Sequence, residues 1–366
     1  IKKYLQIENV IELEINLCNK ISNILTQTVK KRLISDRPVC ALLSGGLDSS
    51  LVTALVVHIS MNKFKKHPSQ IHTWSIGMKG SEDLKYAKMV ADHIKSVHHE
   101  VIVTPEDMLK TLPKTIKRIE SWDTTTVRAS TPMILLCDYI KEHTDITVIY
   151  SGEGSDEASG SYLYFKNAPN ENEFHKECLR LIKDLRYFDV LRCDKTTAGN
   201  GLEVRVPFLD KEFMDVAMSI NPQDKMINGE RMEKWVVRKA FEDMIPESVA
   251  WRQKEQFSDG VGYSWIDTLK EMVNDLITDE QMANAHFRFP IQTPQNKEEF
   301  YYRSIFEEHF PSDAAALCVP QEPSVACSTK IALEWDEAFK DMNDPSGRAV
   351  AKVHDDAYQE KEAVAV

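Results

Sequence analysis

The sequence predicts an α/β protein built on a doubly wound parallel sheet, with a mostly helical C-terminal half. Up to about residue 160, short apolar runs alternate with segments in which apolar residues recur every three or four positions. This alternation is typical of parallel strands joined by crossover helices, since each strand is then covered on both faces. Beyond residue 160 the strand candidates fade and helical patterns continue.

The first predicted helix covers residues 12–33 and ends before Pro38. Residues 39–43 follow as a wholly apolar run, which predicts the first strand. A glycine turn and a second predicted helix come next. The remaining elements of this part alternate in the same way, with predicted strands at 71–77, 99–103 and 146–150 and predicted helices at 84–94, from Pro105 onward and at 131–143.

Helical patterns dominate the second half, and prolines and glycine interrupt the chain from residue 311 onward. The predicted helices there are 173–188, 211–218 and 232–244. We therefore expect four parts, namely a helix or linker at 1–35, the sheet domain at 36–160, a helical remainder at 161–310 and an irregular tail at 311–366.

Composition is that of a soluble globular protein, with 42% hydrophobic and 28% charged residues among 366. No apolar run approaches the roughly 18 residues that span a bilayer, and no secretory signal is visible. Seven cysteines without a CxxC pair indicate reduced thiols, so we expect a cytoplasmic protein. The net charge of −12 disfavours nucleic acid and anionic lipid, and an anionic ligand would need local lysines or a divalent metal.

The stretch "CALLSGGLDSSLVTAL" at residues 40–55 places a glycine-hydroxyl turn between a strand and a helix. Such a turn binds anions, because glycines admit a close backbone approach and the first helical N–H groups face the ligand. The candidate ligands of an anion are Ser44, Gly45, Gly46, Ser49 and Ser50. The GxxxxGK[ST] pattern is missing and no lysine lies in the turn, so we expect no fixed cation here and a charge balanced by metal.

Two acidic turns then suggest a metal site. Asp48 lies in the first turn, and a carboxylate beside a phosphate needs a cation between them, for which Mg²⁺ is the natural candidate. "SGEGSDE" at residues 151–157 follows another apolar strand, and the ends of neighbouring parallel strands face one crevice. Asp156 is the predicted second metal ligand, which leaves Glu153 as a general base. The simpler interpretation is that these acids only stabilise helix N-termini.

Several long motifs carry a family resemblance. "SGGLDSS" after a buried strand resembles the pyrophosphate loop of the N-type ATP pyrophosphatases, and "SGEGSDE" resembles the synthetase domain of glutamine-hydrolysing asparagine synthetases. The same family is indicated by further motifs across nearly the whole chain, namely "TTTVRASTPM", "GLEVRVPFLDK", "VAWRQKEQFSDGVGYSWID", "PSVACS" and "EWDEAFKDMNDPSGRAV". The resemblance implies an adenine nucleotide alpha hydrolase-like fold.

The resemblance implies that the side-chain carboxylate of aspartate attacks the α-phosphorus of ATP, which gives β-aspartyl-AMP and pyrophosphate. Ammonia then attacks the acyl carbon and releases asparagine and AMP. Asp48 and Asp156 would hold Mg²⁺ during the displacement, and Glu153 would deprotonate the attacking nitrogen. Lys254 would stabilise charge on phosphate and acyl oxygens. Without the family motif, it would be interpreted as a surface lysine.

Further contacts are expected for both substrates. Adenine contacts are assigned to Leu42 and Ile76 at neighbouring strand ends, with backbone contacts from Ser151 and Gly152. A planar guanidinium suits a carboxylate bidentately. The residues expected to recognise aspartate are accordingly Thr125, Thr126 and Arg128, with Tyr162 in the same pocket.

Full-length members of the resembling family begin with a glutaminase domain whose first residue is a cysteine. This chain begins with Ile1, so we expect a fragment or processed product in which residues 1–35 once joined that domain. Its nitrogen donor would then be free ammonia, or ammonia from a glutaminase on another chain. The sequence leaves open whether the chain forms a homo-oligomer.

Two other functions fit the sequence less well. One is a related synthetase, such as a β-lactam-forming one, that adenylates a different carboxylate. The other is a non-catalytic regulatory or ammonia-channel subunit.

The histidines at 93, 98 and 99 lack a carboxylate partner in a metal-binding pattern, so we interpret them as hydrogen-bonded or solvated side chains. Residues 287–290 are interpreted as packing residues.

Overall fold

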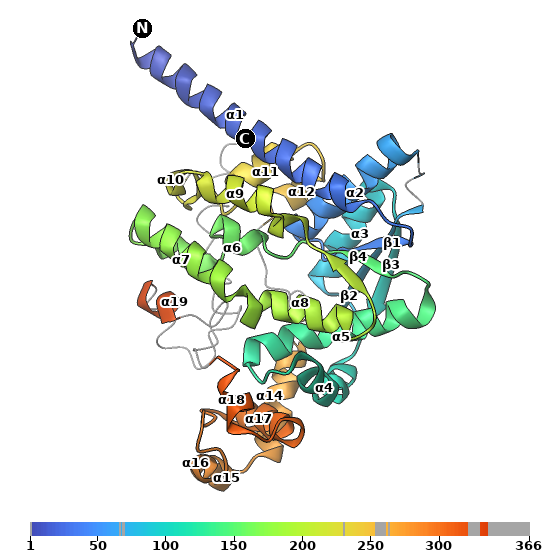
Figure 1. The fold of residues 1–366 in the computed structure, drawn as a ribbon, viewed down its shortest axis with the longest axis vertical. Helices are drawn as coiled ribbons and strands as arrows, with labels where there is room; N and C mark the ends of the chain where they lie inside the picture. Colours follow the sequence, from blue (N-terminus) through green and yellow to red (C-terminus); the bar gives the residue numbers. More distant parts are fainter. Residues whose placement is uncertain are drawn as a thin grey trace.

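The computed structural model describes residues 2–65, 67, 70–229, 231–252, 261–262, 264–320 and 330–335. Its centre is a sheet of five parallel strands in the order β3-β2-β1-β4-β5 (Figure 1). The strands are β1 (Val39–Leu42), β2 (His72–Gly77), β3 (Val97–Ile102), β4 (Val148–Tyr150) and β5 (Glu203–Arg205). The parallel sheet predicted from the sequence is confirmed.

The order of the strands reverses next to β1. The chain passes from β1 outward to β2 and β3, and then returns to place β4 on the other side of β1. Cys40 of β1 is aligned with His72 of β2 and with Ile149 of β4. In parallel α/β sheets, ligands bind beyond the carboxyl ends of the two strands that flank such a reversal. The loops after β1 and β4 therefore lie where a site is expected.

Helices make up most of the rest of the described chain. In the first half they are α1 (Lys2–Arg32), α2 (Leu47–Phe64), α3 (Glu82–Ile94), α4 (Pro105–Ile119), α5 (Thr124–His143) and α6 (Ser155–Ser159). The next group is α7 (Glu171–Asp184), α8 (Asp189–Ala198), α9 (Lys211–Ser219), α10 (Pro222–Lys225), α11 (Trp235–Ala240) and α12 (Glu247–Ala250). The C-terminal helices are α14 (Ser264–Leu276), α15 (Asp279–Ala283), α16 (Ala285–Arg288), α17 (Lys297–His309), α18 (Asp313–Leu317) and α19 (Lys330–Trp335).

Alternate residues of the central strands face two separate cores, which is why these strands are apolar throughout. Ala41 and Tyr150 belong to the core formed with α1, α2, α3, α9 and α11. Cys40 and Ile149 belong to the core on the opposite face, formed with α4, α5, α14 and α17. Helices thus cover both faces of the sheet, as in a doubly wound fold.

Several elements differ from their predicted extents. Helix α1 extends back to Lys2, ten residues before the predicted start, and strand β3 begins two residues earlier than predicted. Helix α11 is much shorter than the predicted 232–244. Helix α5 begins at Thr124 because the Asp123 side chain caps it by accepting a bond from the Thr126 amide. The predicted start at residue 131 is therefore seven residues too late.

Strand β5 was not predicted. It has only three residues, two of them charged, and it lies at the edge of the sheet beside β4. Since its side chains are exposed or half-buried, it lacks the apolar run that marked β1 and β4.

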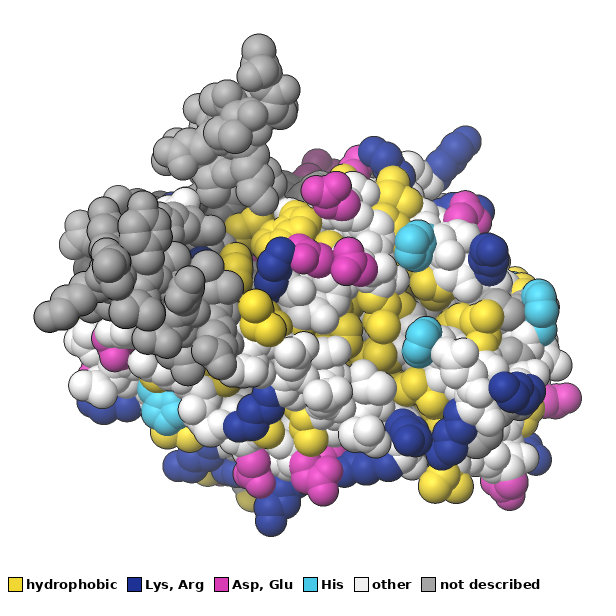
Figure 2. All heavy atoms as spheres, turned by 90° about the horizontal axis from the view of Figure 1, so that it is seen from above, with side chains coloured by type: hydrophobic (Ala, Val, Ile, Leu, Met, Phe, Trp, Pro, Cys, Tyr) yellow, Lys and Arg dark blue, Asp and Glu magenta, His cyan; other side chains and the backbone are white. Residues whose placement is uncertain are grey.

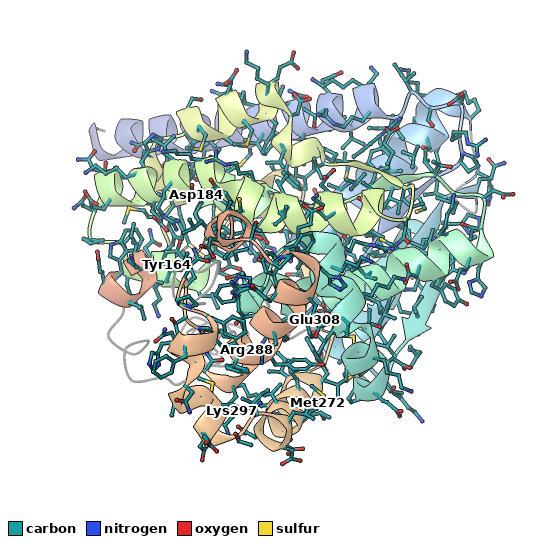
Figure 3. The ribbon with its side chains drawn as sticks, turned by 60° about the horizontal axis from the view of Figure 1, so that its bottom comes forward. Tyr164, Asp184, Met272, Arg288, Lys297 and Glu308 are labelled. Atoms are coloured by element: carbon teal, nitrogen blue, oxygen red, sulfur yellow. The ribbon has the colours of Figure 1, made fainter. Side chains whose placement is uncertain are left out.

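Helices α14 and α17 lie against α4, away from α1 (Figure 1), whereas α19 packs on Tyr164 and Phe165. Figure 3 shows this group, in which Met272, Arg288 and Lys297 are labelled. Phe289 is buried there in a small cluster with Phe300, so its interpretation as a packing residue is confirmed. Phe287, by contrast, is exposed. Of the predicted irregular tail, α18 and α19 are helical, and residues 336–366 lie outside the described residues.

Acidic and basic side chains are interspersed on the face shown in Figure 2, with apolar side chains between them. None of the described helices combines the length and apolarity that a membrane crossing needs.

Candidate active site

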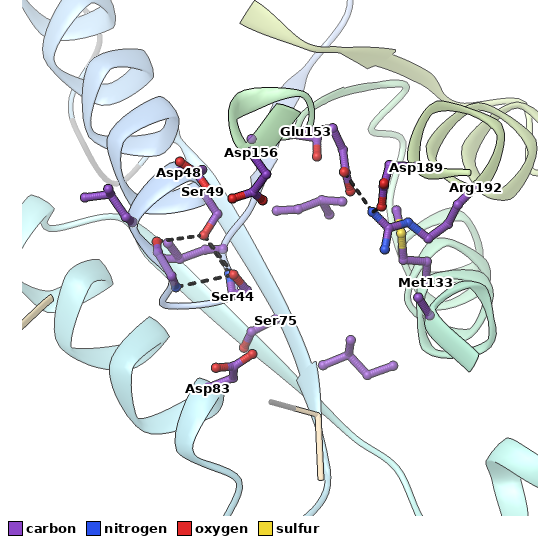
Figure 4. A pocket seen from close by; sticks show the side chains of 18 of the residues that line it. Ser44, Asp48, Ser49, Ser75, Asp83, Met133, Glu153, Asp156, Asp189 and Arg192 are labelled. Carbon is purple, nitrogen blue, oxygen red and sulfur yellow. Dashed lines mark hydrogen bonds and ion pairs between the residues drawn. The ribbon is translucent and has the colours of Figure 1, made fainter. Parts of the chain in front are cut away.

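A pocket lies at the carboxyl ends of β1, β2 and β4, beside the reversal of strand order (Figure 4). It is lined by both predicted turns, by α5 and α8, and by three cations that follow later in the chain. The predicted site residues that line it are Leu42, Ser44, Gly46, Asp48, Ser49, Ile76, Thr125, Ser151, Gly152, Glu153, Asp156 and Tyr162.

Hydrogen bonds to its own hydroxyl groups stabilise the turn after β1. The Ser44 and Ser49 hydroxyl oxygens lie 2.9 Å apart, and the Ser44 amide donates to the Ser49 hydroxyl over 3.2 Å. The Gly46 amide also donates to the Ser44 hydroxyl over 3.3 Å. Gly46 is the N-cap of α2, so the first N–H groups of this helix lie beside the turn. This arrangement is suited to bind an anion.

Gly45 and Ser50 belong to the turn but do not line the pocket. Gly45 has a φ of +79°, and a Cβ atom added there would lie 2.6 Å from the Ala87 amide nitrogen. Ser50 is fully buried. Both residues therefore shape the turn by packing.

The two turns approach each other closely, as the sequence predicted. A Cβ atom added to Gly152 would lie 2.7 Å from the amide nitrogen of Ser49 and 2.8 Å from the carbonyl carbon of Asp48. Only glycine allows this contact without displacing backbone. Asp48 and Asp156 consequently point into the same part of the pocket in Figure 4.

Lys234 provides a cation that the sequence analysis missed. Its ammonium Nζ lies 2.5 Å from Asp48 Oδ2 and 2.5 Å from Asp156 Oδ1, and its side chain is buried. Burial alone would lower the pKa of Lys234, but the carboxylates of Asp156 and Asp48 outweigh it, so this pKa lies above its usual value. The turn itself contains no lysine, as expected, and Lys234 brings a cation to it from a distant part of the chain.

The sequence signal for Lys234 is weak. The lysine directly precedes α11 in "GERMEKWVV", about 190 residues after the first turn, and it has a left-handed backbone with a φ of +58°. Nothing in that spacing points to the turn after β1.

The carboxylates of Asp48 and Asp156 fit a divalent cation. Both already contact the Lys234 ammonium through Asp48 Oδ2 and Asp156 Oδ1, while Asp48 Oδ1 is buried without a hydrogen-bond partner among the described residues and could take a cation. Within the described part of the chain, no three His, Cys, Asp or Glu side chains gather as a metal-binding group. A metal would therefore need further ligands from a bound substrate, as Mg²⁺ commonly takes from phosphates.

Glu153 lies on the opposite side of the pocket, in contact with α8 (Figure 4). Its Oε2 accepts a hydrogen bond of 2.8 Å from Arg192 Nη2. The same nitrogen lies 2.8 Å from Asp189 Oδ1. Burial raises the pKa of Glu153 to about 7; Arg192 opposes the shift, while Asp189 and Asp156 add to it. A carboxyl group with this pKa can accept a proton near neutral pH.

Tyr162 lines the pocket next to this pair, as predicted. Its hydroxyl donates to Glu157 Oε1 over 2.6 Å and lies 3.3 Å from Asp189 Oδ2. Tyr162 therefore also orients Asp189.

Thr126 and Arg128 do not line the pocket. The Thr126 hydroxyl and amide donate to Asp123 Oδ2 over 2.6 and 2.8 Å. Arg128 is buried and pairs bidentately with Glu298 of α17, at 2.8 Å from Nε and 2.6 Å from Nη2. The structure thus uses both residues within the protein, and of the predicted threonine-arginine set only Thr125 faces the pocket.

An apolar wall lies beside Leu42 and Ile76. Most of it is formed by Trp74, Ala129, Met133 and Leu136, none of which was predicted as a site residue. They are contributed by β2 and α5, whose apolar residues look like ordinary core in sequence. The wall is suited to contact a planar apolar ring such as adenine.

Arg252 also lines the pocket, at the start of the "WRQKEQ" motif. Its guanidinium donates to the Gly45 carbonyl over 3.4 Å, lies 3.2 Å from Asp83 Oδ1 and stacks on the Tyr86 ring. Arg252 thus ties this motif to the first turn. Lys254, which we predicted to be catalytic, lies outside the described residues.

Two of the three histidines considered from the sequence make hydrogen bonds. His98 lies 2.9 Å from the Thr73 hydroxyl and 3.1 Å from the Ser75 hydroxyl. His99 lies 2.8 Å from His72. For both, the interpretation as hydrogen-bonded side chains is confirmed.

Comparison with known proteins identifies the family. The asparagine synthase family matches residues 20–173 and 166–336. The glutamine-hydrolyzing asparagine synthetase B of Escherichia coli (strain K12) is 51% identical over 347 residues, which are 93% of this chain and 62% of that protein. The glutamine-hydrolyzing asparagine synthetase of Triphysaria versicolor is 52% identical over 341 residues, which are 91% of this chain and 58% of that protein.

The chain spans about three fifths of the length of these curated relatives. Among solved structures, an NMN synthetase from Francisella tularensis matches 85% of this chain and 98% of its own at 11% identity, with a TM-score of 0.35, which is too low to carry an argument about the fold. The family match and the sequence identities are decisive: the chain belongs to the asparagine synthase family.

Proposed function

We propose that this chain makes asparagine from aspartate, ATP and ammonia, with β-aspartyl-AMP as the intermediate. The observation that carries the proposal is the meeting of two glycine turns at the reversal of strand order. Asp48, Asp156 and Lys234 lie on one side of this pocket and Glu153 on the other. An anion site and a carboxyl group with a raised pKa thus face the same cavity.

In the first half-reaction, the turn after β1 binds the pyrophosphate portion of ATP through its backbone N–H groups and hydroxyls. A carboxylate oxygen of aspartate attacks the α-phosphorus, and the bond to the β-phosphate breaks. Mg²⁺, when bound by Asp48 and Asp156, neutralises phosphate charge. Lys234 holds these two carboxylates together and adds positive charge near the departing pyrophosphate. We assign the same kind of stabilisation to Lys254 on the strength of its motif alone.

In the second half-reaction, the nitrogen of ammonia bonds to the acyl carbon. The carbon–oxygen bond to the phosphate breaks, and AMP leaves with the electron pair. Glu153 takes the proton that the attacking nitrogen must lose. The pKa of about 7 supports this role, because the carboxylate is then partly ionised near neutral pH yet basic enough to accept a proton.

Adenine would lie against the apolar wall that includes Trp74, beside Leu42 and Ile76, with backbone contacts from Ser151 and Gly152. For aspartate, Thr125 and Tyr162 are the candidates within the pocket. Arg128 is not retained as a direct contact, because Glu298 already engages its guanidinium.

The relatives are named as glutamine-hydrolyzing enzymes, and we propose that a glutaminase domain or subunit supplies ammonia to this synthetase. We also propose a cytoplasmic location, which agrees with the six free thiols among the described residues. The 366 residues themselves should use ammonium directly.

The test supplies aspartate, Mg-ATP and ammonium to the purified chain and measures asparagine, AMP and pyrophosphate. We expect all three in equal amounts, and no asparagine when glutamine replaces ammonium. Asp48→Asn should abolish aspartate-dependent exchange of pyrophosphate into ATP. AMP formed with a different carboxylic acid would instead favour a related synthetase, and nucleotide binding without AMP release would favour a regulatory subunit.

A further inference from the structure

The pocket contains a three-membered charge cluster in which one nitrogen bridges two carboxylates. Arg192 Nη2 lies 2.8 Å from Glu153 Oε2 and 2.8 Å from Asp189 Oδ1. All three residues line the pocket, and each side chain is at most 19% exposed. Figure 4 shows Arg192 reaching from α8 toward Glu153, on the side opposite Asp48.

The helix and its neighbours fix the position of Arg192. Asp189 and Arg192 are three residues apart in α8, so they lie on the same face of the helix. Asp189 is oriented in turn by the Tyr162 hydroxyl, 3.3 Å from its Oδ2. The guanidinium therefore has a fixed carboxylate on one side and the catalytic candidate on the other.

Glu153 faces charged and titratable groups from three directions. Arg192, Asp189 and Cys193 face it from α8, and Asp156 faces it from α6. Lys234 lies across the pocket, bound to Asp156. Of these, Arg192 is the cation hydrogen-bonded to Glu153, and Asp189 shares that cation.

We propose that Arg192 is a positioning residue that fixes the orientation and charge of Glu153 for proton transfer, and that Asp189 limits how strongly it does so. Arg192 engages Oε2, so the proton leaving the attacking nitrogen is accepted at Oε1. The inference rests on the proposed function, since it takes Glu153 as the base of the second half-reaction.

The direction of the effect follows from charge. Glu153 acts as a base only when it is ionised, so the rate of amide formation falls as pH drops through its pKa. Removing the positive charge of Arg192 favours the neutral carboxyl group, which raises that pKa. Removing the negative charge of Asp189 takes away a repulsive neighbour and leaves Arg192 wholly to Glu153, which lowers the pKa.

The experiment compares Arg192→Met, Arg192→Lys and Asp189→Asn with the unmodified chain over a range of pH. Asparagine formation is measured per concentration of free ammonia, and aspartate-dependent pyrophosphate exchange is measured in parallel. The acid midpoint of asparagine formation should rise by about one pH unit or more in Arg192→Met and fall in Asp189→Asn. Arg192→Lys should return the midpoint toward that of the unmodified chain.

The pyrophosphate exchange profile should keep its midpoint in every variant, because that half-reaction does not use Glu153 as a base. A purely structural role would lower both half-reactions together without moving a midpoint, and that result would overturn the inference. Midpoints that move in the same direction in Arg192→Met and Asp189→Asn would overturn it as well. If Arg192→Met does not fold, as judged by circular dichroism, the Lys and Asn variants carry the same test.

Failure of the proposed function gives a different pattern. An unmodified chain that shows neither aspartate-dependent exchange nor asparagine formation would refute the proposed function and this inference with it. An active unmodified chain with unshifted variant midpoints would refute this inference alone.

Discussion

Single residues set the distance between the two turns of the site. Gly152 has no side chain, and the backbone of Asp48 and Ser49 occupies the space where a Cβ atom would lie. Gly45 makes a similar contact with Ala87 on the other side of the first turn. The close approach of the two turns at Gly152 lets the two carboxylates share the Lys234 ammonium.

Gly152→Ala should therefore push the two turns apart. We expect a loss of unfolding free energy of about 1–3 kcal/mol, which is typical of overpacking. Pyrophosphate exchange should fall by about 10²-fold, because misplacing reacting groups by about 1 Å can cost that much. Urea unfolding and the exchange assay measure the two effects.

Gly229→Ala is the matched control, since a Cβ atom added there meets nothing within 4 Å. It should leave stability and exchange close to those of the unmodified chain. A Gly152→Ala variant that behaves like this control would show that the close approach of the turns is not needed.

The contact of Lys234 with the two acids could not be predicted from the sequence. The acids of the two turns were predicted because each follows an apolar strand in a recognisable pattern. Lys234 is brought to them only by the packing of α11 near α1 and the first turn. Its partners are 186 and 78 positions away in the chain, so no local pattern reveals them.

At the scale of elements, α5 joins the site to the C-terminal helices. Thr125 and Met133 of α5 line the pocket, while Arg128 on the same helix is locked to Glu298 of α17. The Tyr302 hydroxyl donates to Glu298 as well, over 3.0 Å. The ion pair thus sets how α5 is seated against α17.

Arg128→Met should destabilise the protein by about 3–5 kcal/mol, because it leaves Glu298 as a buried carboxylate without its cation. Glu298→Met should have a comparable effect, and the double variant should lose much less than the sum of the two. Urea unfolding of the four chains completes the cycle. If Arg128→Met instead keeps its stability but has a raised KM for aspartate, Arg128 binds aspartate, as expected from the sequence.

Apolar patterns predicted most of the sheet, and their absence explains what was missed. Strands β1 and β4 are largely buried and therefore stand out as apolar runs, whereas β2 also contains His72, Thr73 and Ser75. Strand β5 has Glu203 and Arg205 at the sheet edge, so its pairing with β4 is a tertiary effect with no signal of its own. The start of α5 was hidden for a related reason, since a single cap at Asp123 outweighs the weak helix propensity of the threonines that follow.

At the scale of the whole molecule, the site joins parts of the chain that are far apart. One of the two cores contains residues from Ile21 to Ala250 and includes both β1 and α11. The pocket draws on the same span, from Leu42 to Arg252. The sheet and the helices that follow it therefore share one core and one site, and they should unfold together.

A nucleotide that bridges this site should stabilise the molecule as one unit. We expect ATP with Mg²⁺, without aspartate, to raise the midpoint of a single thermal transition, since a ligand at 100 times its Kd adds about 2.7 kcal/mol. The rise should shrink when EDTA removes the metal, and also in Asp48→Asn, which loses a metal ligand, because in either case less metal is bound to balance the phosphate charge. Differential scanning calorimetry measures these midpoints. Two transitions, of which only one responds to nucleotide, would show that the halves unfold separately, and an equal rise in Asp48→Asn would show that this carboxylate does not contribute to nucleotide binding.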